Sequence, residues 1–310
     1  MVQMPKILLS FAGGGTRVWY TLKLLQMLVD EMGTAKFLSD PRVRFAGVSS
    51  GALLALALYG GMTLSDFELA YLSELNHIFH PNFLGGLFYP KYGNKHRQRA
   101  YHRIFGGKNL DYHYAYPLSA GNVPEYQLPP FIVAFNMVKR TIAYDWHTSF
   151  EDVAMATTSA PVYFPTFHEY VDGGIVENQP ASLYCAEVEA KYPGLTVENR
   201  FMRPHLLSII SIGTGTSRHP KGNTNKIWPK SRRWGLVEWS TRIINALMSA
   251  ENEFPLPAWV GRHISLNGPL SRDIPLDDTS LESRKMMERD AYSQFATVKQ
   301  AAKLLKEELA

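Results

Sequence analysis

The 310-residue chain contains a single cysteine, Cys185, so an internal disulfide is impossible and zinc sites built on several cysteines are excluded. A reducing compartment is the simplest explanation of this cysteine content. No apolar run approaches the roughly 18 to 20 residues that span a bilayer. The N-terminal run of about seven is too short and too weakly charged for a secretory signal. The sequence therefore predicts a cytoplasmic protein whose contact with any membrane is peripheral, and it leaves secretion without a cleaved signal open.

Acidic residues are missing from two stretches that are rich in lysine and arginine. Residues 91–108 and residues 216–233 each contain six basic residues and no acid, in a chain of net charge +4 and pI about 8.9. Phospholipid headgroups or a nucleic acid could bind to either stretch, and a solvated basic face is the simpler alternative. The composition, 45% hydrophobic and 19% charged, is typical of a globular protein with a sizeable core and excludes a disordered chain.

Strands and helices alternate along the chain. Apolar runs at 6–11 and 43–48 predict two buried parallel strands. Each is followed by a predicted helix, over 16–32 and over 51–59, and the second helix is apolar all round and therefore belongs inside the protein. Further strands are predicted within residues 130–146, 167–175 and 205–216. The alternation predicts an α/β fold with three α/β/α layers around a mostly parallel central sheet.

Two capping patterns predict where further helices begin. One pairs Ser65 with Glu68, and the other pairs Thr148 with Glu151. A C-terminal amphipathic helix is expected at about 280–309, because apolar residues there are spaced three or four apart. These residues are Met287, Ala291, Phe295, Val298, Ala302 and Leu305.

Residues 80–128 form the least regular part of the sequence and are rich in Gly, Pro, Tyr, His and Arg. Such a segment is typical of a cap or border of a functional site. Another helix is predicted at 234–253. No repeat, low-complexity segment or linker divides the chain, so a single domain over residues 1–310 is expected.

The motif G-x-S-x-G runs from Gly47 to Gly51 and makes Ser49 its central serine, with Ser50 directly after it. In this pattern the nucleophile lies on a tight, strained strand-to-helix turn that only small neighbours fit. The N-terminus of the following helix adds the positive end of its dipole. The motif indicates Ser49 as a candidate nucleophile, and a plain strand-to-helix corner is the simpler alternative.

Three consecutive glycines, Gly13, Gly14 and Gly15, lie at the first strand-to-helix turn and are followed closely by Arg17. Their backbone N–H groups can approach a negative oxygen, which suits an oxyanion hole or a phosphate cradle. The dinucleotide-binding pattern fails, because Val18 stands where its third glycine belongs, and the Gly-Lys-Ser/Thr of a P-loop is absent. An oxyanion hole for acyl transfer is therefore favoured.

Asp172, followed by two glycines at the end of a predicted strand, is the candidate base. An attacking serine hydroxyl must lose its proton, and a carboxylate within hydrogen-bond reach can accept it directly or orient a histidine that does. A tight turn uses the same Asp-Gly-Gly sequence, so this motif alone does not distinguish the two interpretations.

Five motifs in this order resemble the patatin-like phospholipase family: "GGGTR", "GVSSG", "ATTSAPVYFP" at 156–165, "DGGIVENQP" and "SIGTG" at 211–215. The resemblance implies an α/β fold, a Ser–Asp dyad without histidine, and hydrolysis of lipid acyl esters through an acyl-enzyme. It makes Ser49 the nucleophile and Asp172 the general base. It further assigns the oxyanion hole to Gly13, Gly14 and Gly15, support of that loop to Arg17, and the elbow to Gly47 and Gly51. Three positions depart from the family pattern without removing a catalytic atom: Ala12, Val18 and Gln179.

Two rival interpretations stay open. In a Ser–His–Asp esterase, Asp172 would orient His205, His219 or His263. In a non-catalytic module, the glycine turns would bind an anionic ligand and the basic stretches a nucleic acid. The second leaves Ser49 without a role, so no nucleic-acid partner is expected, and neither a metal nor a cofactor is predicted.

Phospholipid is the expected substrate, with a membrane surface as the expected partner. The two basic stretches and the aromatic residues of 80–93 favour phospholipids over soluble esters. We expect the region 80–105 to dock on an anionic membrane and to admit an acyl chain. The sequence does not indicate an oligomeric state.

Overall fold

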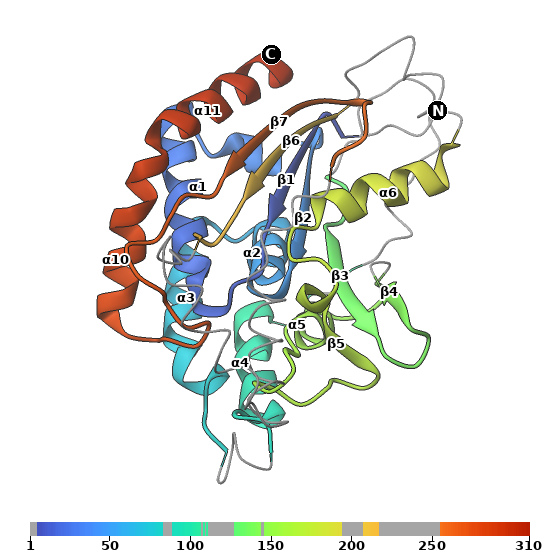
Figure 1. Ribbon diagram of the computed structural model, residues 1–310, viewed down its shortest axis with the longest axis vertical. Helices are drawn as coiled ribbons and strands as arrows, with labels where there is room; N and C mark the ends of the chain where they lie inside the picture. The colour runs from blue at the N-terminus through green and yellow to red at the C-terminus, as the bar shows by residue number, and fades with distance from the viewer. Residues whose placement is uncertain are drawn as a thin grey trace, which may run out of the picture.

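The computed structural model describes residues 5–82, 89–106, 108, 110, 127–143, 146–193, 207–216 and 255–310. Within these residues, the strands form one sheet in the order β4-β3-β2-β1-β6-β7, and β5 pairs with β3 (Figure 1). The strands are β1 (Ile7–Phe11), β2 (Val43–Val48), β3 (Phe131–Asn136), β4 (Thr141–Ala143), β5 (Tyr170–Asp172), β6 (Leu207–Ile212) and β7 (Val260–Leu266). In this described part the only antiparallel pairings are those of β4 and β5 with β3, so the predicted mostly parallel sheet is confirmed.

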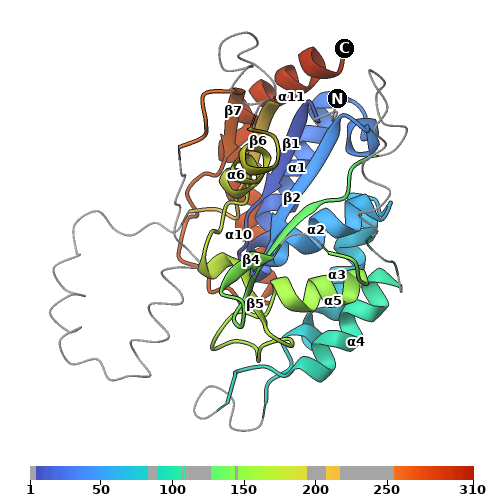
Figure 2. The ribbon, with the colours of Figure 1, turned by 90° about the vertical axis from the view of Figure 1, so that its right-hand side faces the viewer.

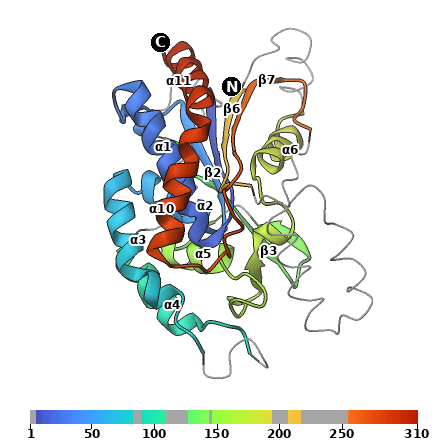
Figure 3. The ribbon, with the colours of Figure 1, turned by 60° about the vertical axis from the view of Figure 1, so that its left-hand side comes forward.

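Helices cover both faces of the sheet, as Figure 3 shows, with α1, α10 and α11 on one face and α6 on the other. The helix α2 lies buried beside the sheet, and α3, α4 and α5 gather at one end of the molecule (Figure 2). The helices and 3₁₀ turns are η1 (Gly15–Arg17), α1 (Val18–Met32), η2 (Lys36–Ser39), α2 (Ser49–Tyr59), α3 (Leu64–Ile78), α4 (Asn94–Phe105), α5 (Phe150–Thr157), η4 (Gly173–Ile175), α6 (Ala181–Lys191), α10 (Leu281–Ala291), η5 (Tyr292–Gln294) and α11 (Phe295–Leu309). Among the described helices, none has the length and apolar character needed to cross a bilayer.

The two buried clusters of apolar side chains correspond to the two faces of the sheet. The larger cluster includes odd-numbered residues of β1, such as Leu9, together with α1 and α2. The smaller one includes Leu8 of β1 and the buried face of α6. Side chains alternate across a strand, so a continuous apolar run such as that of β1 supplies both faces at once.

Both predicted helix caps are wrong by one or two residues. The α3 helix is capped by Thr63, whose side chain accepts a hydrogen bond from Asp66 N at 3.1 Å, while Asp66 Oδ2 accepts one from Thr63 N at 3.2 Å. The α5 helix is capped by Ser149, whose Oγ accepts from Asp152 N at 3.0 Å. In each case the sequence contains two overlapping capping patterns, and only the packing of the helix selects one.

The irregular segment predicted at 80–128 contains a regular helix, α4, where the structure describes it. Several of its basic side chains are buried or ion-paired, so fewer of them can bind an external anionic surface than the sequence suggests. Arg97 is fully buried, Lys91 pairs with Asp277, and Arg103 pairs with Glu74. The helix predicted at 234–253 and nearly all of the basic stretch 216–233 lie outside the described residues.

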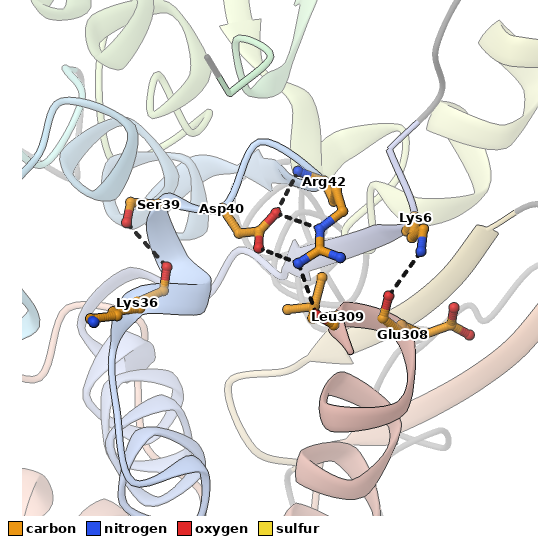
Figure 4. A network of polar contacts seen from close by, with 7 residues as sticks. All are labelled: Lys6, Lys36, Ser39, Asp40, Arg42, Glu308 and Leu309. Atoms are coloured by element: carbon orange, nitrogen blue, oxygen red, sulfur yellow. Dashed lines mark hydrogen bonds and ion pairs between the residues drawn. The ribbon is translucent and has the colours of Figure 1, made fainter. Parts of the chain in front are cut away.

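The C-terminal segment forms two helices, α10 and α11, joined by the 3₁₀ turn η5. Of the six apolar residues expected to face the core, Phe295 is the exception at 44% exposure, because it lies at the turn where α11 begins. The end of α11 is fastened to the loop before β2. Figure 4 shows Arg42, which donates to Asp40 Oδ2 at 2.8 Å and to the carbonyl of Leu309 at 2.9 Å.

Candidate active site

Ser49 lies at the junction of β2 and α2, where the chain turns sharply. Its φ of 53° is in the left-handed region that a serine rarely adopts, so the turn holds it under strain. A Cβ at Gly47 would lie 2.6 Å from the Cα of Ala52, and one at Gly51 would lie 2.4 Å from the carbonyl oxygen of Phe11. Both positions therefore require glycine, and the predicted tight strand-to-helix turn is confirmed.

A threonine at the end of α5 supports this turn. Ser49 N donates to Thr157 Oγ1 at 2.9 Å, and Thr157 Oγ1 donates in turn to the carbonyl of Val133 in β3 at 2.6 Å. Thr157 thus connects the turn to the neighbouring strand. The motif at 156–165 contributed to the family resemblance, but sequence reasoning gave Thr157 no role.

Asp172 is the last residue of β5 and is completely buried. Its N–H donates to the carbonyl of Ser159 at 3.1 Å, and its Oδ1 accepts from Gly174 N at 2.8 Å. Its Oδ2 has no partner with normal hydrogen-bond geometry, yet the Ser49 hydroxyl lies close enough to lower the pKa of the carboxyl. Long or poorly aligned contacts between nucleophile and base are common in enzymes without substrate. The fold therefore brings the two sequence-predicted residues together.

Burial raises the pKa of Asp172 to about 7. Three smaller effects act in the opposite direction, since the Ser49 hydroxyl, the Gly174 N–H and the positive charge of Arg97 all favour the charged carboxylate. A carboxylate with this pKa is a much stronger base than one in water and is about half ionised at neutral pH.

Arg97 is the main residue that the sequence analysis misplaced, because it was counted in a basic surface stretch. Its guanidinium donates to the carbonyl of Thr158 at 2.7 Å and to Ser159 Oγ at 3.0 Å. Burial lowers the pKa of Arg97 to about 10, so it remains charged at neutral pH. A sequence signal existed: Arg97 shares the helical spacing of the buried residues Tyr101 and Ile104 on α4.

The glycine loop between β1 and α1 contacts the turn at Ser49. A Cβ at Gly13 would lie 3.0 Å from that of Ser49. Gly14 N donates to Ser50 Oγ at 3.1 Å, and Gly13 N donates to the carbonyl of Asn178 at 3.4 Å. Two of the three N–H groups therefore have partners within the protein, so an external negative oxygen has to replace or share these bonds in order to bind there. Ser50 holds the loop in place.

The last glycine of the loop and a residue just after it fix the loop's conformation. Gly15 has a φ of 57°, and a Cβ there would lie 2.0 Å from the carbonyl oxygen of Leu276, so no other residue fits. Arg17 is buried, and its N–H donates to the carbonyl of Gly14 at 3.0 Å. Val18 then begins α1.

A narrow apolar cavity of about 40 Å³ opens beside Ser49. Its wall contains Leu53, Ile78, Phe79, Tyr163, Phe164 and Leu276. A pocket that encloses a whole small-molecule ligand measures roughly 300 to 1,000 Å³, so these side chains have to move before a long chain can enter. The apolar wall matches an acyl chain better than a polar substrate.

The described residues do not support the alternative of a Ser–His–Asp esterase. His263 lies on β7, where its Nε2 is 2.9 Å from Ser211 Oγ. Within the described part of the chain, the groups that set the pKa of Asp172 include no histidine. His205 and His219 lie outside the described residues.

Comparison with known proteins identifies a family and several relatives that the chain resembles. The family model described as patatin-like phospholipase matches residues 9–183. Patatin-like protein 2 of Arabidopsis thaliana is 26% identical over 294 residues, which cover 79% of this chain and 69% of that protein. Intracellular phospholipase A2 of Caenorhabditis elegans is 26% identical over 231 residues, covering 67% of this chain and 19% of that protein. The cGAMP-activated phospholipase of Pseudomonas aeruginosa is 26% identical over 228 residues, covering 67% of this chain and 62% of that protein.

Proposed function

Since this chain belongs to the patatin-like phospholipase family, and since its family and its phospholipase-named relatives support a lipid acyl hydrolase, we propose that it cleaves fatty acyl esters of phospholipids through a dyad of Ser49 and Asp172. One observation carries the proposal: a strained serine hydroxyl lies beside a buried carboxyl of pKa about 7, next to an apolar cavity.

The proposed reaction has two steps. Ser49 Oγ attacks the ester carbonyl and gives its proton to Asp172, while N–H groups of the glycine loop bind the oxyanion. The tetrahedral intermediate then collapses, and the leaving alcohol takes the proton from Asp172. A water molecule next attacks the acyl-enzyme with Asp172 again as base, which releases the fatty acid and restores Ser49.

Fatty acid release from phospholipid vesicles, combined with active-site labelling, tests this function. We expect the wild-type protein to release free fatty acid from vesicles and to react with a fluorophosphonate at Ser49. Peptide mass spectrometry distinguishes Ser49 from Ser50, which serves as an internal control because its Oγ already accepts from Gly14 N. A label on Ser50, or release of fatty acid without any label at Ser49, contradicts the proposed dyad.

The pKa of Asp172 predicts the pH dependence of the reaction. A general base acts only when it is deprotonated, so kcat/KM rises with pH and levels off above about 7. Below that pH it should fall about tenfold for each pH unit. Among the described residues, the charged and titratable groups facing Asp172 are Arg97 and Tyr101, both from α4. A soluble p-nitrophenyl ester keeps membrane binding out of the measurement. A single inflection near pH 4 would show that the base is an ordinary exposed carboxylate.

A further inference from the structure

The turn between β3 and β4 exposes two apolar and two basic side chains in succession. Met137 is 52% exposed and Val138 is 77% exposed, and Lys139 and Arg140 after them are also exposed. We call residues 137–140 the hairpin tip. Its shape is fixed, because Asn136 Oδ1 accepts hydrogen bonds from Val138 N at 3.0 Å and from Lys139 N at 2.9 Å.

The two cations of the hairpin tip, Lys139 and Arg140, form no ion pair within the described part of the chain. The carboxylate of Glu169 accepts a hydrogen bond from Asn136 Nδ2 at 3.5 Å instead. In the stretch 91–108, Lys91 and Arg103 have acidic partners, and among the described residues α4 carries no exposed large apolar side chain beside its exposed Lys95 and Arg99. An exposed apolar pair beside two unpaired cations matches the two layers of an anionic membrane surface, acyl chains and then headgroups.

The hairpin tip is connected to the wall of the apolar cavity. Met137 N donates to the carbonyl of Glu169 at 2.8 Å, on the segment that leads back to Tyr163 and Phe164 of that wall. On the other side of this segment, Tyr92 N donates to the carbonyl of Tyr163 at 2.8 Å. In Figure 1 the β3–β4 turn lies at the right-hand edge of the lower half of the molecule, beside β5 and across from α4.

We propose that the hairpin tip is the membrane-docking element of this protein. Met137 and Val138 enter the interface of an anionic phospholipid bilayer, and Lys139 and Arg140 bind the headgroups. Docking here places the cavity wall at Tyr163 and Phe164 next to the lipid surface that supplies the substrate. This inference rests on the proposed phospholipid hydrolysis and moves the docking site away from the region 80–105 that the sequence favoured.

Vesicle binding by paired variants tests the proposal. One pair removes the apolar residues (Met137→Ser with Val138→Ser), and the other removes the charges (Lys139→Gln with Arg140→Gln). Matched controls change another exposed apolar pair, on α3 (Leu69→Ser with Leu72→Ser), and two exposed cations on α4 (Lys95→Gln with Arg99→Gln). The probe is co-sedimentation with phosphatidylcholine vesicles, with and without phosphatidylglycerol.

Each lost cation should weaken binding to anionic vesicles about fivefold, so the charge pair should weaken it roughly 25-fold, and only when phosphatidylglycerol is present. The apolar pair should weaken binding to both kinds of vesicle. Both pairs should lose vesicle hydrolysis in proportion and keep full activity on a soluble ester, and the controls should behave like wild type. Wild-type binding by both hairpin variants, or a larger loss in the α4 control, overturns the proposal. A wild-type protein that does not hydrolyse the soluble ester instead refutes the proposed function.

Discussion

Replacing Asp172 with asparagine should abolish hydrolysis and, at alkaline pH, make the protein more stable. The asparagine cannot take the Ser49 proton, and loss of a general base costs roughly 10²- to 10⁴-fold in rate. Fluorophosphonate labelling of Ser49 should slow to a similar degree. The oxygen of the amide can still accept the hydrogen bond from Gly174 N, which now holds Asp172 Oδ1 at 2.8 Å, so the local structure should persist.

The gain in stability follows from the pKa of Asp172. That pKa is 3.8 in an exposed carboxyl and about 7 in the folded protein, so between these values the unfolded chain loses its proton first. The free energy of unfolding therefore falls as pH rises from about 4 to about 7, by up to roughly 4 kcal/mol. An asparagine carries no charge and escapes this loss. We expect its melting temperature to match wild type near pH 4 and to exceed it by roughly 5 °C at pH 8.

Two serine variants complete this experiment. Ser49→Ala should be as inactive as the asparagine variant, because it lacks the attacking oxygen. Ser50→Ala should keep measurable activity with a reduced kcat, since it removes only the hydrogen bond that holds Gly14. Full activity in Asp172→Asn, or equal losses in Ser49→Ala and Ser50→Ala, is incompatible with the dyad.

Removing the buried cation at position 97 should destabilise the protein and shift its pH profile. Arg97→Met removes the buried donor to Ser159 Oγ and one of the two donors to the carbonyl of Thr158, which keeps only Ala160 N at 2.9 Å. The expected loss is roughly 3 kcal/mol in the free energy of unfolding, measured by urea denaturation. The positive charge of Arg97 also lowers the pKa of Asp172, so its removal should move the inflection in kcat/KM above pH 7.

A lysine at this position separates the two effects. Arg97→Lys keeps the charge but loses the planar, multidentate donor, so it should be less stable than wild type and keep an inflection near pH 7. If both variants are less stable and share the wild-type pH profile, Arg97 only supports the fold. Circular dichroism at 25 °C establishes that each variant is folded before its profile is measured.

The sequence predicted those features that depend on neighbouring residues in the chain. The apolar runs of β1 and β2 gave two strands, and the all-apolar run after Gly51 gave the buried helix α2. The glycines at 47 and 51 pointed to a tight turn because only a residue without a side chain fits where two backbones approach. The helix starts at Thr63 and Ser149 were misplaced, since overlapping capping patterns are equivalent until packing selects one.

Only the tertiary structure determined which of these residues come into contact and how burial shifts their pKa values. Ser49 and Asp172 are 123 positions apart, and they meet because β5 pairs with β3 next to β2. The shift of the Asp172 pKa to about 7 depends on burial by several elements at once, which composition does not express. Likewise, a sequence counts Arg97, Lys139 and Arg140 as equal charges. The fold buries the first beside the carboxyl and exposes the other two, because it places one on the packed face of a helix and the others on a turn.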